Sequence, residues 1–207
     1  MDAFRTVAPL VLASGSPRRR DFLADLGLAF TVRAADLDET PRPGEKPEIF
    51  VRRLARDKAM AVATQQPAVW VLAADTAVVA RGEILGKPCD AADAEKMLMR
   101  LSGCWHEVWT GFCVCRGTGA EPLTGAVCTG VRFMALDREL CRAYIRTGEP
   151  MDKAGAYGIQ GKGAFLVEEI SGSYTNVVGL PLAEVLVALR SLGVIEVAGQ
   201  RRQEESP

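Results

Sequence analysis

Apolar and amphipathic segments alternate along the first half of the chain, a pattern typical of α/β folds. We expect buried strands at residues 10–13 and 68–80 and an extended segment at residues 29–34. Between them, Ser16-Pro17 supplies the N-cap and first residue of a helix that ends near residue 26, and residues 48–63 carry helical periodicity. The pattern therefore predicts strand, helix, strand, helix and strand in succession.

The second half of the chain continues this alternation with more strands. The expected elements are a helix at 91–101, strands at 107–115 and 126–133 joined by the turn Gly117-Thr118-Gly119, a helix at 137–146, a strand at 164–170 and a final helix at 181–192. No internal repeat or linker divides the sequence, so we predict one mixed α/β domain over residues 1–199, bilobed around a cleft. Residues 200–207 are polar and predict a disordered tail.

Composition narrows the class of protein further. The 207 residues are 48% apolar with a net charge of −1, and the absence of a long basic run argues against nucleic acid as a partner. The apolar run at residues 8–13 is too short for a signal peptide, and no segment approaches the ~18 apolar residues of a membrane span. Six cysteines without a C-x-x-C pair predict reduced core residues, so we expect a cytoplasmic protein.

Asp75 and Thr76 interrupt the most apolar of the expected strands. They are the only polar residues between positions 68 and 80. Burying an unpaired carboxylate costs several kcal/mol, so a cation, a metal ion or a set of hydrogen-bond donors must meet Asp75. This strand therefore predicts a functional site.

Three arginines break a second local rule. Arg18, Arg19 and Arg20 fall in the first turn of a helix, where the helix dipole disfavours cations. Together with the hydroxyl groups of Ser14 and Ser16 and the free N–H groups of the helix start, they predict a phosphate-binding site. The alternative is that the arginines are simply solvated.

Two lysines stand at positions that also suggest a site. Lys58 lies on the same helix face as Val51 and Leu54, and this face should be apolar. It either meets an anion inside the protein or extends its ammonium group to water. Lys87, in Gly86-Lys87-Pro88, is either a further cation of the site or an ordinary loop residue.

Carboxylates for a metal ion come from the loop Asp36-Leu37-Asp38-Glu39, which is otherwise a solvated acidic loop. Mg²⁺ takes one or two protein carboxylates together with phosphate oxygens of a substrate. His106 is the only histidine, which excludes histidine-rich metal sites. We expect a structural role for it rather than general-base catalysis.

The glycine-rich segment 153–163 resembles a P-loop only superficially. Ala156 stands where the first glycine belongs, and Gly163 replaces the serine or threonine. Gln160 instead offers an amide to the edge of a base, and the glycines allow close approach of the backbone to a ligand. The alternative is a plain loop between strands.

These motifs together resemble the Maf family of nucleoside triphosphate pyrophosphatases, in order and over about residues 9–192. They are Ala13-Ser14-Gly15-Ser16-Pro17-Arg18-Arg19, Leu54-Ala55-Arg56-Asp57-Lys58-Ala59, Ala74-Asp75-Thr76, Gly86-Lys87-Pro88, Leu101-Ser102-Gly103 with His106 and Thr110-Gly111, and the segment from Lys153 to Gly161. The resemblance implies an α/β fold with a mixed sheet, similar to the inosine triphosphate pyrophosphatases. It also implies cleavage of a nucleotide between its α and β phosphates, which yields a monophosphate and pyrophosphate.

The resemblance also assigns roles within the site. Gly158-Ile159-Gln160 and the segment 173–181 look like the branch that acts on dTTP and UTP, rather than the one that acts on 7-methyl-GTP. The implied base-selecting positions are Arg18, Thr76 and Gln160, and the implied triphosphate ligands are Ser14, Arg18, Arg19, Lys58 and Lys87. An amide at Gln160 can pair with the O4 and N3 edge of thymine or uracil, and such pairing tolerates modified pyrimidines, which suggests a house-cleaning role.

We expect Asp75 to act as the general base, and Asp75 with Glu39 to bind a divalent cation, Mg²⁺ in the first place and Mn²⁺ as the alternative. An aspartate with a pKa near ~4 is a weak base, so metal activation or a raised pKa must contribute. A homodimer is a further expectation. The competing hypothesis is a nucleotide-binding regulator of cell division without significant turnover.

Overall fold

A computed structural model describes residues 2–117 and 121–199 of the protein. Its strands are β1 (Phe4–Thr6), β2 (Leu10–Leu12), β3 (Thr31–Val32), β4 (Trp70–Ala80), β5 (Glu83–Leu85), β6 (Trp105–Arg116), β7 (Leu123–Phe133), β8 (Val167–Ser171) and β9 (Ile195–Val197). Its α-helices are α1 (Pro17–Asp25), α2 (Pro47–Gln65), α3 (Ala91–Leu101), α4 (Arg138–Ile145), α5 (Tyr174–Val178) and α6 (Leu182–Ser191). Three 3₁₀ turns cover Glu149–Asp152, Ala154–Ala156 and Gly161–Leu166.

Within the described residues, seven strands form one mixed sheet in the order β3-β2-β4-β6-β7-β8, with β5 beside β4. β2 runs parallel to β3 and β4, and the other pairs are antiparallel. The chain ends meet in a separate antiparallel pair of β1 and β9. The predicted mixed α/β architecture is confirmed.

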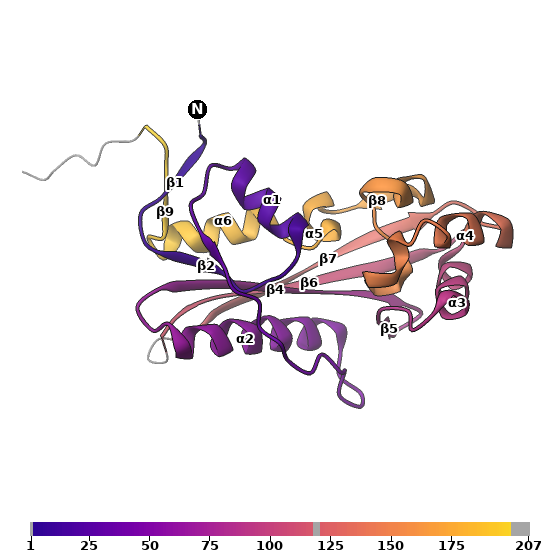
Figure 1. Ribbon diagram of the computed structural model, residues 1–207, viewed down its shortest axis with the longest axis horizontal. Coiled ribbons are helices and arrows are strands. Elements are labelled where there is room, and N and C mark those ends of the chain that lie inside the picture. The colour runs from indigo at the N-terminus through magenta and orange to yellow at the C-terminus, as the bar shows by residue number, and fades with distance from the viewer. Residues whose placement is uncertain (1, 118–120, 200–207) are drawn as a thin grey trace, which may run out of the picture.

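Helices cover both faces of the first half of the sheet (Figure 1), with α2 on one side and α1 and α6 on the other. Successive side chains of β4 point to opposite faces of the sheet and pack into different cores. Val71 and Ala73 pack with α2, whereas Leu72 and Ala74 pack on the side of α6. A strand buried on both faces reads as a continuous apolar run, which is why this segment is so apolar in the sequence.

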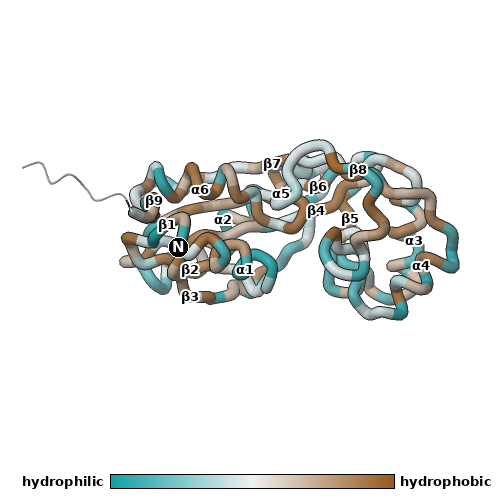
Figure 2. Tube along the Cα trace, turned by 90° about the horizontal axis from the view of Figure 1, so that it is seen from above, coloured by the Kyte–Doolittle hydropathy of each residue, from teal (hydrophilic) through white to brown (hydrophobic). Residues whose placement is uncertain are grey.

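The long strands continue into a second lobe. Figure 2 shows β4 and β6 leading from the end that holds α1, α2 and α6 towards the end that holds α3 and α4. There, residues of β4, β6 and β7 form another core with α3, α4 and Tyr157. The predicted site residues Asp75 and Thr76 lie where the two lobes meet, because β4 crosses between them.

Several local predictions differ from the structure. Residues 164–166 belong to a 3₁₀ turn rather than to a strand, and the short helix α5 was not among the predicted elements. Ser173 caps α5 by accepting a hydrogen bond from the Asn176 N–H. β1 and β9 were not predicted, since each is three residues long. Part of the predicted Gly117–Gly119 turn and the predicted tail at 200–207 lie outside the described residues.

The cysteines only partly follow the prediction. All six are free, but Cys89 and Cys128 are exposed rather than in the core, while Cys113, Cys115 and Cys141 are buried as expected. No helix among residues 2–117 and 121–199 has the length and apolar content needed to cross a membrane.

Candidate active site

Asp75 and Lys58 form a buried ion pair between the sheet and α2. Asp75 continues the row of β4 side chains that faces α2, and Lys58 Nζ lies 2.6 Å from its Oδ1. Asp75 and Lys58 are 7% and 8% exposed. Gly111 lies opposite Asp75 on β6, where a Cβ atom would stand 2.3 Å from the carbonyl oxygen of Val51 in α2. This glycine allows α2 to approach the sheet closely enough for the pair to form.

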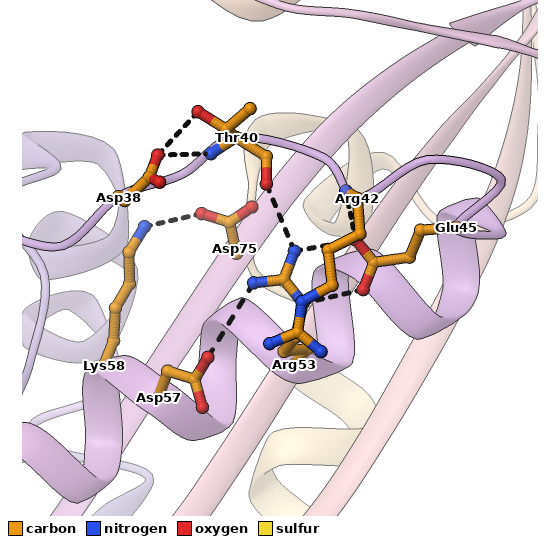
Figure 3. A network of polar contacts seen from close by, with 8 residues as sticks. All are labelled: Asp38, Thr40, Arg42, Glu45, Arg53, Asp57, Lys58 and Asp75. Atoms are coloured by element: carbon orange, nitrogen blue, oxygen red, sulfur yellow. Dashed lines mark hydrogen bonds and ion pairs between the residues drawn. The ribbon is translucent and has the colours of Figure 1, made fainter.

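Glu39 completes this charge cluster from the other side. Its Oε1 lies 2.5 Å from Lys58 Nζ, so one ammonium group contacts two carboxylates. Lys58 is therefore engaged by anions inside the site, which excludes the alternative that it extends to water. Figure 3 shows Lys58 pointing from α2 towards Asp75.

The loop that carries Glu39 is fixed by contacts on both sides of it. Thr40 donates hydrogen bonds to Asp38 Oδ1 from its N–H and its hydroxyl group, at 2.9 and 2.6 Å. Arg53 of α2 binds both carboxylate oxygens of Glu45 at 2.6 and 2.7 Å and donates to the Thr40 carbonyl (Figure 3). These contacts hold the acidic loop against α2.

Arg19 is half-buried on the opposite face of β4. Its guanidinium group donates to the carbonyl oxygens of Ala74 and Gly179 at 2.6 and 2.7 Å, and to the hydroxyl groups of Ser14 and Thr76, each at 3.0 Å. Four of its five N–H groups therefore have protein partners. Thr76 continues the network to Thr110 at 2.9 Å.

The arginines of the first helix thus differ in environment. The Arg18 side chain has no hydrogen bond or ion pair with any residue in the described part of the chain, and the same holds for Lys87. Both line the same cavity as Asp75. In the described ranges these two cations have no direct ion pair and attract Asp152 and Glu39 only at longer range, whereas Arg19 is bound by hydrogen-bond acceptors of the protein.

The electrostatic environment raises the pKa of Asp75. Burial is the main cause, and it outweighs the opposing attraction of Lys58 and Arg19, while Glu39 adds to the increase. Burial would also raise the pKa of Glu39, but its hydrogen bond and attraction to Lys58 bring the net shift below the usual value. The two carboxylates are therefore shifted in opposite directions, and Asp75 is the stronger base.

A cavity of about 400 Å³ brings together most of the residues that the sequence suggested for the site, but not Arg20, Asp36 or Asp38. Its lining includes Ser14, Arg18, Arg19, Glu39, Lys58, Asp75, Thr76, Lys87 and Gln160. It also contains Asp152, Lys153 and Tyr157, which the sequence did not single out. In the sequence, Lys153 and Tyr157 stand out only as part of the glycine-rich motif, and no local anomaly marks Asp152.

Two acidic residues of the cavity, Asp75 and Glu39, could hold a divalent cation. In the described ranges, no group of three or more His, Cys, Asp or Glu side chains is arranged to hold a metal ion. The carboxylates of Asp75 and Glu39 nevertheless converge on a single cation, the Lys58 ammonium group. Mg²⁺ commonly takes one or two carboxylates and completes its shell with water and substrate oxygens, so this pair suits a cation bound together with a phosphate ligand.

His106 has the structural environment that was expected. It is 4% exposed, its Nε2 lies 2.8 Å from the Tyr157 hydroxyl oxygen, and its ring packs edge-to-face against Phe133 and Tyr157. Burial lowers its pKa to about 4. It is a neutral residue that supports Tyr157 in the cavity wall.

Comparison with known proteins identifies the family to which the chain belongs. The family model described as "Maf-like protein" matches residues 9–192. The dTTP/UTP pyrophosphatase of Myxococcus xanthus is 53% identical over 94% of this chain and 96% of its own length, and that of Anaeromyxobacter dehalogenans strain 2CP-C is 56% identical over 89% and 94%. A HAM1 protein structure from Coxiella burnetii aligns with a TM-score of 0.45 and 20% identity over 61% of this chain and 73% of that one. With a family match that spans most of the chain, the protein belongs to the Maf family.

Proposed function

We propose that the protein hydrolyses dTTP and UTP to the nucleoside monophosphate and pyrophosphate. The observation that carries the proposal is the buried Asp75–Lys58 pair in the wall of a cavity with unpaired cations. Its support in sequence is the similarity to relatives named dTTP/UTP pyrophosphatases at 53% and 56% identity.

Asp75 acts as the general base towards an attacking water. A raised pKa brings a carboxylate closer to the basicity that proton abstraction needs, and burial raises the pKa of Asp75 in this way. Lys58 orients the Asp75 carboxylate through the 2.6 Å contact. Ser14, Arg18 and Lys87 hold the triphosphate from the cavity wall, and the unpaired charges of Arg18 and Lys87 stabilise the charge that develops on the leaving pyrophosphate.

Asp75 and Glu39 would hold a divalent cation, Mg²⁺ or Mn²⁺. When bound, such an ion acidifies a coordinated water and neutralises phosphate charge. Lys58 keeps the two carboxylates together, since it contacts both.

Base selection falls to Gln160 and the residues around it. The side chain of Gln160 has no hydrogen-bond partner among the described residues and lines the cavity, so its amide is available to a pyrimidine edge. We assign Arg19 a positioning role together with phosphate binding, because it ties Thr76 and Ser14 to the backbone of β4. Modified pyrimidine triphosphates are further candidate substrates.

The direct test is to incubate the protein with Mg²⁺ and a panel of nucleoside triphosphates and to resolve the products. Pyrophosphate and monophosphate from dTTP and UTP support the proposal. Release of inorganic phosphate, or pyrophosphate chiefly from purine or methylated guanine nucleotides, contradicts it. Retained nucleotide binding without turnover supports the regulator of cell division instead.

Asp75→Asn tests the assignment of the base. It should bind dTTP while turnover falls by several orders of magnitude, because the amide cannot accept the proton. Asp21→Asn, which changes an exposed acid of α1, is the matched control and should keep the wild-type rate.

The proposal also includes location in the cytoplasm, a single domain over residues 1–199 and a homodimer. Light scattering measures the oligomeric state.

A further inference from the structure

The glycine-rich segment 158–163 is held from behind by two side chains that do not line the cavity. Tyr144 comes from α4, and Glu149 begins the 3₁₀ turn Glu149–Asp152. The Tyr144 hydroxyl group accepts a hydrogen bond from the Gly158 N–H at 3.1 Å and donates one to Glu149 Oε1 at 2.9 Å. The Tyr144 hydroxyl group therefore acts as a donor and as an acceptor at the same time.

Glu149 binds the other end of the same segment. Its Oε2 accepts a hydrogen bond from the Lys162 N–H at 2.9 Å, and its Oε1 accepts one from the Gly163 N–H at 3.0 Å. Burial alone would raise the pKa of Glu149, but these hydrogen bonds and that of Tyr144 lower it, so the group is a carboxylate at neutral pH. Hydrogen bonds to a carboxylate are stronger than those to a neutral acceptor.

The segment has little room to adopt another conformation. A Cβ atom on Gly163 would lie 2.5 Å from both the Tyr144 hydroxyl oxygen and the Gly158 carbonyl oxygen. Gly161 has φ +77°, and a Cβ atom there would lie 2.8 Å from Glu149 Oε2. The backbone is therefore wrapped tightly around the two side chains, with Gln160 between the two points of attachment.

We propose that Tyr144 and Glu149 are positioning residues that set the base specificity of the cavity by fixing Gln160. The inference rests on the proposed function, in which the Gln160 amide contacts the base. A directional hydrogen bond demands placement within about 0.5 Å, and a site built around such a bond discriminates strongly among bases. Asp75 and Lys58 lie on β4 and α2, so the reacting centre does not depend on the hydrogen bonds of Tyr144 and Glu149.

The test compares kcat/KM for dTTP with that for dATP in Tyr144→Phe and Glu149→Gln. Phenylalanine keeps the packing of the buried ring and removes only the hydroxyl group. We expect KM for dTTP to rise and kcat to change little, so that the dTTP/dATP ratio falls about tenfold, the effect of losing one directional hydrogen bond. Glu95→Gln is the matched control, because Glu95 accepts hydrogen bonds from Arg138 and Arg142 of the same helix, away from the segment. It should keep the wild-type ratio.

A double-mutant cycle separates positioning from general destabilisation. In a Gln160→Ala background, Tyr144→Phe should no longer change the ratio, because there is no amide left to position. A wild-type ratio in Tyr144→Phe, or an equal change with and without Gln160, overturns the inference. Affinities for non-hydrolysable α,β-imido analogues of dTTP and dATP, measured on the same variants, test it even if the wild-type protein does not turn over dTTP. These affinities distinguish failure of the proposed hydrolysis from failure of the inference that Tyr144 and Glu149 position Gln160.

Discussion

Arg53 offers a test of how the protein positions Glu39, because it links the acidic loop to α2. Its two hydrogen bonds to Glu45 form a bidentate pair, and the side chains of Arg53 and Glu45 are 14% and 6% exposed. A third bond reaches the carbonyl of Thr40, the residue next to Glu39. Arg53→Met removes all three while keeping the stem of the side chain on the helix. The loop then loses its contact with α2 at this point.

The size of the effect follows from the geometry. Exposed ion pairs contribute up to about 1 kcal/mol and hydrogen bonds to charged groups about 1.5–3 kcal/mol, so a bidentate pair near the surface should contribute about 2 kcal/mol. This changes the equilibrium between the docked and the released loop by about 30-fold. Because Glu39 travels with the loop and Asp75 does not, kcat/KM should fall by up to that factor, and more Mg²⁺ should be needed for half-maximal rate.

The assay is kcat/KM for dTTP over a series of Mg²⁺ concentrations. Arg52→Met is the control, since Arg52 is the neighbouring arginine of α2, is 46% exposed and contacts Glu48 at 3.5 Å. It should remain within about twofold of the wild-type protein. A wild-type rate and Mg²⁺ dependence in Arg53→Met would refute the reasoning that this pair positions Glu39.

The pair of Arg53 and Glu45 also predicts how the stability of the protein changes at acidic pH. Arg53 is the main cause that lowers the pKa of Glu45 from 4.5 to about 2. A carboxylate with a depressed pKa stabilises the folded state above its ordinary pKa, and this contribution is lost as the pH falls from about 4.5 towards 2. The free energy of unfolding of Arg53→Met should therefore decline less than that of the wild-type protein over this range.

Other variants test the core and the ion pair. The pKa of buried His106 is about 4, so as the pH falls the unfolded chain takes up a proton at this residue before the folded protein does. The free energy of unfolding should therefore fall by about 2 kcal/mol between pH 7 and 5. Urea titrations should show this decrease in the wild-type protein and not in His106→Gln. Gly111→Ala should lower the free energy of unfolding by about 3 kcal/mol, because its Cβ atom would collide with the Val51 carbonyl group, and an unchanged urea midpoint would contradict that contact. Lys58→Met should lose at least about 100-fold in kcat while remaining folded by circular dichroism, because Asp75 loses its orienting partner, whereas a near-normal rate would show that the pair is dispensable.

The sequence predicts those parts of the site in which a residue violates a local rule. Asp75 is visible because it interrupts an apolar strand, and Lys58 because it occupies an apolar helix face. Their pairing joins two residues 17 positions apart on neighbouring elements, and only the sheet register and the close packing at Gly111 reveal it. The family resemblance was needed to group these separate anomalies into one site.

Residues that satisfy local rules remain invisible in the sequence even where they shape the site. Tyr144 belongs to the apolar face of an ordinary amphipathic helix, and Glu149 lies in a polar turn. Their importance arises from hydrogen bonds to backbone groups up to 14 residues away. The pair of β1 and β9 was also missed, because each strand is three residues long and its partner stands about 190 residues away in the sequence.

The distribution of charge explains why neighbouring arginines have different roles. Arg19 and Lys58 are matched within the protein by hydrogen-bond acceptors and by the carboxylates of Asp75 and Glu39. Arg18 and Lys87 remain as surplus positive charge on the cavity wall, with no ion-pair partner among the described residues. A cavity whose internal charges are already balanced can offer its surplus cations to a polyanion without disrupting its own structure. In the proposed function, Arg18 and Lys87 are therefore the cations that would bind phosphate at the lowest cost to the fold.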